Sequence, residues 1–89
     1  IFLQAKAGGF ADATVSRNIV ATCNGQGIVL NAVSGVAADN TLVDVCPVAG
    51  SKAAPRLDIK AGSHDLVVSG TKGGKVTRAA GLVNVTVQP

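Results

Sequence analysis

Residues 71–77 read Thr-Lys-Gly-Gly-Lys-Val-Thr, and this stretch carries the clearest local structural signal in the chain. Paired glycines suit the positive φ values of a two-residue type I′ turn, which joins two neighbouring antiparallel strands. The stretch therefore predicts a β-hairpin with Gly73-Gly74 at its turn. Lys72 and Lys75 would lie side by side next to this turn and keep it soluble.

Runs rich in Val, Ile, Leu and Thr lie between the other glycines and prolines. Such runs, separated by turn residues, are typical of all-β sandwiches and barrels. Arg17 interrupts the apolar face of one run, which predicts an edge strand or a bulge there. Asn24-Gly25-Gln26-Gly27 predicts a second turn. The predicted strands cover 1–6, 14–22, 28–33, 41–48, 57–60, 64–69 and 82–87, and residues 36–40 fit either a loop or one helical turn.

The Asp58–Gly70 segment has a strand, an Ala-Gly-Ser turn and a second strand. It resembles the hairpins of immunoglobulin-like secreted modules, and this resemblance implies nothing about function. We therefore predict an all-β fold over residues 1–89, a small single-domain β-sandwich, immunoglobulin-like or related, with roughly seven or eight short strands. One disulfide is expected to hold it together.

The composition of the 89 residues excludes several classes of protein. Apolar residues make up 47% of the chain, charged residues 15%, and the mean hydropathy is +0.41. Intrinsic disorder and charged coiled coils are therefore excluded. Eleven glycines interrupt the apolar residues, and no apolar run approaches the roughly 20 residues of a membrane helix. We expect no membrane span.

Cys23 and Cys46 are the only cysteines. A structural zinc site wants four ligands, and only His64 is available to help the two thiols. We therefore predict a Cys23–Cys46 disulfide, worth on the order of 3 kcal/mol by the chain-entropy estimate. A disulfide, together with a chain that starts at Ile1 and has no methionine, predicts a secreted, extracellular protein. Asn84-Val85-Thr86 matches a glycosylation sequon, and its place inside a predicted strand leaves its use open.

The net charge is +3 and the pI is about 9.2. The eight basic residues are spread along the chain, and Phe2 and Phe10 are the only aromatic residues. A clustered basic footprint and aromatic platforms are what nucleic-acid binding requires, so no nucleic acid is expected as a partner. Weak attraction to an acidic cell surface or wall polymer stays open.

The chain has few residues suited to acid–base catalysis, because it has one histidine and no glutamate. His64 and Asp65 are neighbours, and on a strand their side chains are expected to point to opposite faces. A triad needs the acid behind the imidazole, so we predict that the protein is not an enzyme. The spacing of Asp39, Asn40 and Asp44 matches no calcium loop. No cofactor or metal is expected.

The strongest candidate binding segment covers residues 47–56, the longest stretch without periodicity. A loop stiffened by proline and tethered by a disulfide loses little entropy on binding, as in small protease inhibitors, where Lys52 would suit an acidic specificity pocket. A plain surface connection between sheets is the competing interpretation. The predicted binding residues are Pro47, Ser51, Lys52, Pro55 and Arg56.

We predict a secreted, non-catalytic binding protein that recognises another protein or a cell-surface component, in the manner of a small inhibitor, toxin or effector. The alternative is a structural or self-associating surface protein. Its valine-rich end strands, Ile1–Leu3 and Val83–Val87, would pair between chains if they are sheet edges, and a homodimer through these edges is the partner that follows.

Overall fold

The computed structural model describes residues 1–4, 12–23, 25–45 and 54–89. These residues form strands, turns and bends, and none of them forms a helix with the length and hydropathy of a membrane span. The strands are β1 (Phe2–Gln4), β2 (Ala13–Ser16), β3 (Ile19–Thr22), β4 (Gln26–Asn31), β5 (Gly35–Ala38), β6 (Thr41–Asp44), β7 (Arg56–Ile59), β8 (His64–Ser69), β9 (Lys75–Arg78) and β10 (Val83–Val87).

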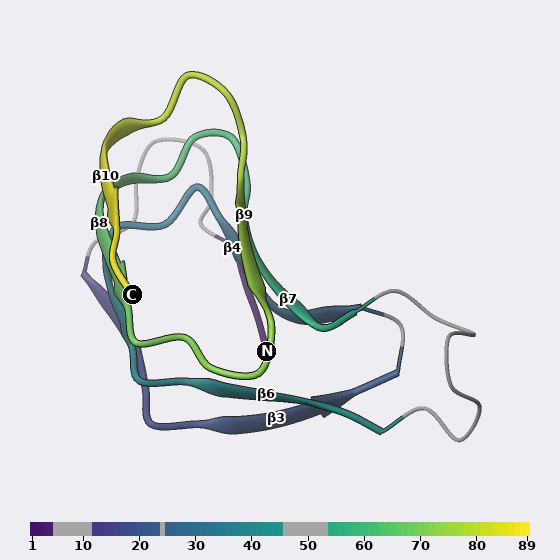
Figure 1. The fold of residues 1–89 in the computed structure, drawn as a ribbon. Coiled ribbons are helices and arrows are strands. Elements are labelled where there is room, and N and C mark those ends of the chain that lie inside the picture. The colour runs from purple at the N-terminus through teal and green to yellow at the C-terminus, as the bar shows by residue number, and fades with distance from the viewer. Residues whose placement is uncertain (5–11, 24, 46–53) are drawn as a thin grey trace.

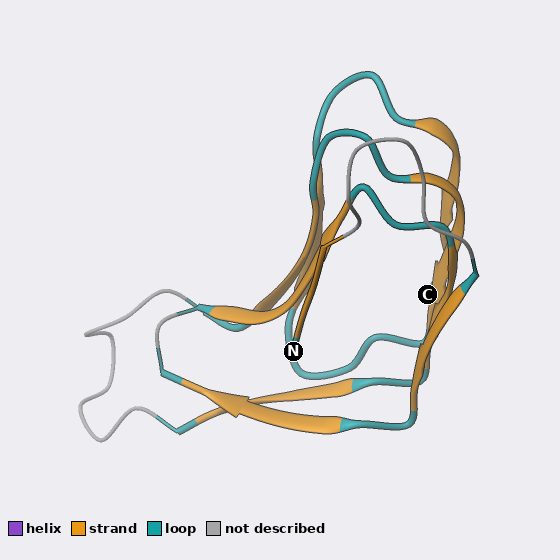
Figure 2. Cartoon of the chain, turned by 180° about the vertical axis from the view of Figure 1, so that it is seen from behind, coloured by secondary structure: helices purple, strands orange, loops and turns teal. Residues whose placement is uncertain are grey.

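The strands form three parallel sheets, and the chain passes through these sheets in successive coils as a solenoid (Figures 1 and 2). Sheet A has the order β1-β4-β7-β9, sheet B the order β10-β8-β5-β2, and sheet C pairs β3 with β6. One coil runs from sheet B through sheet C to sheet A, as β2-β3-β4 does, and β5-β6-β7 repeats the path beside it. This arrangement is a parallel β-helix, in which each coil contacts mainly its neighbours.

The all-β prediction is confirmed, and the expected sandwich of hairpins is wrong. Every strand pair in the described residues is parallel. The Asp58–Gly70 segment forms no hairpin, because β7 lies in sheet A and β8 in sheet B. The strands before and after Gly25 do not pair with each other either. At the turn residues the chain bends and does not reverse its direction. Consecutive strands therefore belong to different sheets.

A repeated corner explains why the predicted strand at 14–22 divides into β2 and β3. The chain turns at Arg17, Asp39 and Gly70, which follow β2, β5 and β8 and have φ values of 54°, 57° and 64°. Left-handed residues of this kind end a strand abruptly. Arg17, which interrupts the apolar pattern, is therefore a corner residue. The ambiguous 36–40 segment is likewise a strand followed by a corner.

An inward-facing polar residue follows each of these corners. Asn40 is fully buried, and its Oδ1 accepts hydrogen bonds from the Asn18 backbone N–H at 3.2 Å and from Asn18 Nδ2 at 3.1 Å. Its Nδ2 donates to the Val15 carbonyl at 3.0 Å. Thr71 occupies the same place in the next coil, and within the described residues its buried hydroxyl oxygen has no hydrogen-bond partner. The side-chain amides of Asn18 and Asn40 therefore join neighbouring coils at this corner.

The predicted type I′ hairpin at Gly73-Gly74 is wrong. Here the chain passes from β8 in sheet B to β9 in sheet A without forming a strand in sheet C, so the third coil is shorter than the second. Lys72 bridges to Thr41 in a parallel sense, and β9 then begins in sheet A. A Cβ on Gly73 would lie 2.0 Å from the Leu42 carbonyl oxygen, and one on Gly74 would lie 2.4 Å from that of Pro55. Glycine is required because the third coil passes directly over the backbone of the second.

The core is a stack of aliphatic side chains from successive coils. Ile28, Leu57, Leu30 and Ile59 extend from sheet A, and each is at most 1% exposed. Leu66 and Val68 extend from sheet B and are equally buried. Inward residues of neighbouring strands share the same register, as Ile28, Leu57 and Val76 do. The period-2 alternation therefore holds even though the sheets are parallel.

The corner amide provides a test of this fold. We expect Asn40→Ala to lower the free energy of unfolding by about 2–4 kcal/mol, because it leaves buried groups of Asn18 and Val15 without partners and opens a cavity. Thr71→Val is the matched control. It should change stability by no more than about 1 kcal/mol, towards stabilisation, because it removes an unpartnered hydroxyl. Urea denaturation measures the free energy of unfolding of both variants. Equal losses of stability in the two variants would contradict the role of the Asn18–Asn40 hydrogen bonds in joining the coils.

Candidate functional site

The outer face of sheet A carries a group of polar side chains from three neighbouring strands. Register places Gln26, Arg56 and Lys75 side by side in one row across β4, β7 and β9. The adjacent outward row runs from Phe2 through Val29 and Asp58 to Thr77. A third outward row passes through Gln4 and Asn31, with Lys60 following β7 at the same level.

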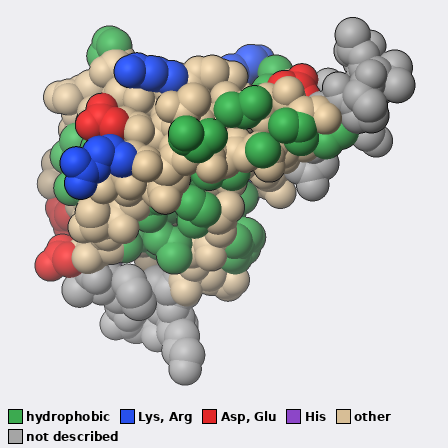
Figure 3. Space-filling view, turned by 90° about the horizontal axis from the view of Figure 1, so that it is seen from below, with side chains coloured by type: hydrophobic (Ala, Val, Ile, Leu, Met, Phe, Trp, Pro, Cys, Tyr) green, Lys and Arg blue, Asp and Glu red, His purple; other side chains and the backbone are tan. Residues whose placement is uncertain are grey.

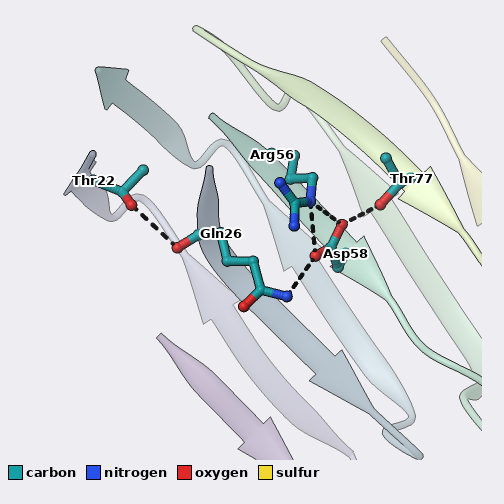
Figure 4. A network of polar contacts seen from close by, with 5 residues as sticks. All are labelled: Thr22, Gln26, Arg56, Asp58 and Thr77. Atoms are coloured by element: carbon teal, nitrogen blue, oxygen red, sulfur yellow. Dashed lines mark hydrogen bonds and ion pairs between the residues drawn. The ribbon is translucent and has the colours of Figure 1, made fainter. Parts of the chain in front are cut away.

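Asp58 is the centre of this face, and it is only 4% exposed although it points outward. Arg56 Nε donates to both carboxylate oxygens, at 2.9 Å and 3.0 Å. Gln26 Nε2 donates to Oδ2 at 3.1 Å, and the Thr77 hydroxyl donates to Oδ1 (Figure 4). The partners come from three neighbouring strands and enclose the carboxylate. A network of this kind locks three coils in register.

The pKa of Asp58 reflects opposing effects. Burial raises the pKa, whereas the hydrogen bonds from Thr77, Gln26 and Arg56 and the charge of Arg56 lower it, and the net result is a pKa below 3.8. Hydrogen bonds and a nearby cation favour the ionised form of a carboxyl group. Asp58 is therefore an ionised structural carboxylate, and its charge is matched locally by Arg56.

Three cations lie on the outer face at this network, Arg56, Lys60 and Lys75, and Arg78 lies beside them at the end of an inward row. Arg56 and Lys75 are register partners, and Arg78 is the partner of Ile59, the residue before Lys60. With strands about 4.8 Å apart and a rise of about 3.3 Å per residue, the four backbone positions lie within roughly 15 Å of one another. Residues that are scattered in the sequence are therefore neighbours in the fold.

Asp58 is the only acidic residue on these strands. The other described aspartates, Asp12, Asp39, Asp44 and Asp65, lie on sheet B, on its corners or at the end of β6. Like charges directly opposite each other on neighbouring strands are destabilising, as Arg56 and Lys75 are. The outer face of β7 and β9 therefore has a local excess of positive charge that an anion would relieve.

A shallow hollow of about 200 Å³ opens beside the network. Asp58, Lys60, Thr77 and Arg78 contribute its polar lining, with Ile59 and Ala79 completing it. Lys60 is exposed, and the Arg78 Nη2 donates to the Val85 carbonyl at 3.3 Å. A hydroxyl, a bound carboxylate and the exposed Lys60 thus meet at one depression, which Arg78 borders. Its chemistry suits hydrogen bonding and charge pairing with an acidic, hydroxyl-rich ligand.

Only part of the predicted 47–56 binding segment lies in the described structure. Pro47, Ser51 and Lys52 lie outside the described residues, so their role as binding residues stays a prediction. Pro55 is buried, and its carbonyl accepts the Lys75 backbone N–H at 3.1 Å. Arg56 starts β7 and binds Asp58. Pro55 directly precedes β7, and Arg56 joins a candidate face that the sequence did not indicate.

His64 and Asp65 do not point to opposite faces, which corrects the sequence-based expectation. His64 Nδ1 and Asp65 Oδ2 are 3.0 Å apart, because Asp65 has a φ of 47° that breaks the strand alternation. Asn84 Nδ2 donates to Asp65 Oδ1 at 2.6 Å, and this bond, followed by that to His64, lowers the pKa of Asp65. Ser63 faces inward, where its hydroxyl donates to the Leu30 carbonyl at 3.2 Å.

Two other features of the described residues bear on where a site could lie. Among the described residues, no group of three or more His, Cys, Asp or Glu side chains is placed to hold a metal ion. The outer face of sheet C is apolar, with Ile19, Val43 and Val45 exposed by 79%, 38% and 53% (Figure 3). This face has no polar group comparable to the network on sheet A. The outer face of sheet A is therefore the candidate site.

Comparison of the chain with models of known protein families, with curated proteins and with solved structures finds no match. The candidate site is therefore assigned from its own geometry and chemistry.

Acid should weaken the fold through Asp58. Because the pKa of Asp58 is lower in the folded than in the unfolded chain, its stabilisation is complete above the ordinary value of 3.8 and is lost as the pH falls through the folded value. Asp58→Asn should lower the free energy of unfolding by about 1–3 kcal/mol at neutral pH and by much less in acid. Urea denaturation of both proteins across this range measures the difference, and a constant difference would contradict the prediction.

Proposed function

We propose that the protein is a secreted, non-catalytic binding protein whose outer sheet A face recognises an acidic polysaccharide of a cell surface or wall. The observation that carries the proposal is the gathering of Arg56, Lys60 and Lys75 on one face around a carboxylate that is already neutralised. Arg56 matches the charge of Asp58, so Lys60 and Lys75 are the cations left on the outer face to attract an anionic ligand. Fixed groups on a rigid sheet need little reordering on binding.

The neighbouring side chains favour a carbohydrate over other polyanions. Gln26, Asn31 and Thr77 supply amide and hydroxyl groups on the same face, which can bond sugar hydroxyls. Phe2 is 61% exposed in the same outward row as Asp58. A single aromatic ring suits stacking on one sugar, whereas sequence-tolerant binding of a nucleic-acid strand uses several successive platforms.

A binding experiment with polygalacturonate, a carboxylated polysaccharide, tests this function. The wild-type protein should bind it in low salt and bind the neutral polysaccharide dextran much more weakly, with affinity falling as salt screens the exposed charges. The double variant Lys60→Gln, Lys75→Gln should weaken binding roughly tenfold, because it removes two exposed ion pairs worth about 0.5–1 kcal/mol each. Isothermal titration calorimetry gives the dissociation constants.

Arg17→Gln is the control, because it removes one positive charge, half the charge change of the double variant, at an exposed corner away from sheet A. It should leave polygalacturonate binding unchanged. Equal weakening by the control would show that net charge, and not the face, attracts the polymer. Tighter binding of a single-stranded oligonucleotide than of polygalacturonate would assign the face to nucleic acid and contradict the proposal. Absence of binding to any polyanion would contradict it as well.

The predicted Cys23–Cys46 disulfide belongs to the same proposal. Cys46 lies outside the described residues. What supports the bond is the register of the preceding strands, in which Thr22 and Asp44 are partners one and two residues before the cysteines. We expect mass spectrometry of the native protein, alkylated without reduction, to find neither thiol modified. Alkylation of both would remove the disulfide and, with it, the support it gives to an extracellular location.

A further inference from the structure

Both ends of the solenoid are open among the described residues. Strands β1 and β2 form the first edges of sheets A and B, and β9 and β10 form the last edges. The apolar side chains that are only partly buried against the core come from these end strands and their flanks. They are Leu3, Ala13 and Val20 at one end and Val76, Leu82, Val85 and Val87 at the other.

We propose that a second copy of this chain stacks head to tail on the open end, with its β1 beside β9 and its β2 beside β10. Sheets A and B both begin at the same end of the molecule and finish at the same other end, so one translation brings both edges into contact at once. Such a heterologous contact leaves a free end on each partner and extends into open assemblies.

The chemistry of the two ends favours another copy over other occupants. Each edge strand presents backbone N–H and C=O groups that only another strand pairs regularly. A single extended peptide would pair with one sheet and leave the other edge and the aliphatic interior uncovered. A second copy supplies two parallel edges with the same spacing, and its inward residues continue the existing rows. Val85 and Val87 of one copy would meet Ala13 and Val15 of the next, because these four residues occupy the same inward rows of sheet B.

The charge of Arg78 opposes the contact between the two copies and weakens their association. Leu3, Leu30 and Ile59 form one inward row of sheet A, and Arg78 occupies the end of that row. Its guanidinium reaches the Val85 carbonyl and thus lies at the open end of the interior. Charged residues in inward positions are a known means of limiting association between sheet edges. Stacking requires Arg78 to move outward, so the wild-type protein associates weakly.

Two end variants test the head-to-tail geometry. Leu3→Lys disables the first end and Val87→Lys disables the last, and each leaves the other end intact. Because both residues are only partly buried, a lysine stem can bend its charge into water without unfolding the chain, which circular dichroism checks. Each variant alone should remain monomeric in sedimentation equilibrium. An equimolar mixture should form a one-to-one dimer through the two intact ends and nothing larger.

Arg78→Leu tests the opposing charge, and Val67→Lys is the control. Val67 is 40% exposed on the outer face of sheet B, away from both ends. Arg78→Leu should lower the concentration at which half the protein is associated by tenfold or more, whereas Val67→Lys should not change it. Monomers at every concentration in both wild type and Arg78→Leu would overturn the proposal. Dimers formed by either end variant alone would overturn it too, because they would require a symmetric contact.

The experiment is independent of the polysaccharide proposal, because it rests on the ends of the solenoid and contains no ligand. Lys60→Gln, Lys75→Gln should associate as the wild type does, since neither residue lies in an inward row. Association without polysaccharide binding, or the reverse, identifies which of the two proposals has failed.

Discussion

The register between successive coils is the constraint on which the rest of this structure depends. Each coil repeats the path of the one before, so that the backbone groups of Val29 and Leu30 pair with those of Asp58 and Ile59. A shift by one residue would turn every inward aliphatic side chain outward. The inner rows, the outward network and the positions of the open ends all follow from this single alignment.

The corners maintain that alignment. Arg17 and Asp39 adopt a left-handed conformation that costs a residue other than glycine about 1 kcal/mol. The cost is offset by bonds between coils, such as that from the Arg17 N–H to the Ala38 carbonyl and those of the Asn18–Asn40 pair. The corner side chains themselves are exposed, so the sequence at these positions is free to vary in charge. A left-handed residue followed by an inward polar side chain, Asn18, Asn40 or Thr71, is the local signature of the corner.

The same alignment organises the outer surface. Outward residues that are separated by a whole coil in the sequence become neighbours in one row, as Gln26, Arg56 and Lys75 do. The buried Asp58 carboxylate secures that row from three strands, while the adjacent cations repel one another. The rigidity of this face and its local excess of positive charge therefore have the same origin in the register between coils.

The alternation of aliphatic and polar residues determined by itself that the chain forms strands, and the seven runs it marked overlap eight of the observed strands. It also marked Arg17 as irregular and Gly73-Gly74 as a point of unusual backbone conformation. Which strands pair was decided only by the tertiary structure. Positive φ at a glycine serves a hairpin turn, a corner and a close crossing equally well, so the local signal cannot distinguish them. The basic face escaped prediction because Arg56, Lys60 and Lys75 become one cluster only when coils of unequal length stack in register.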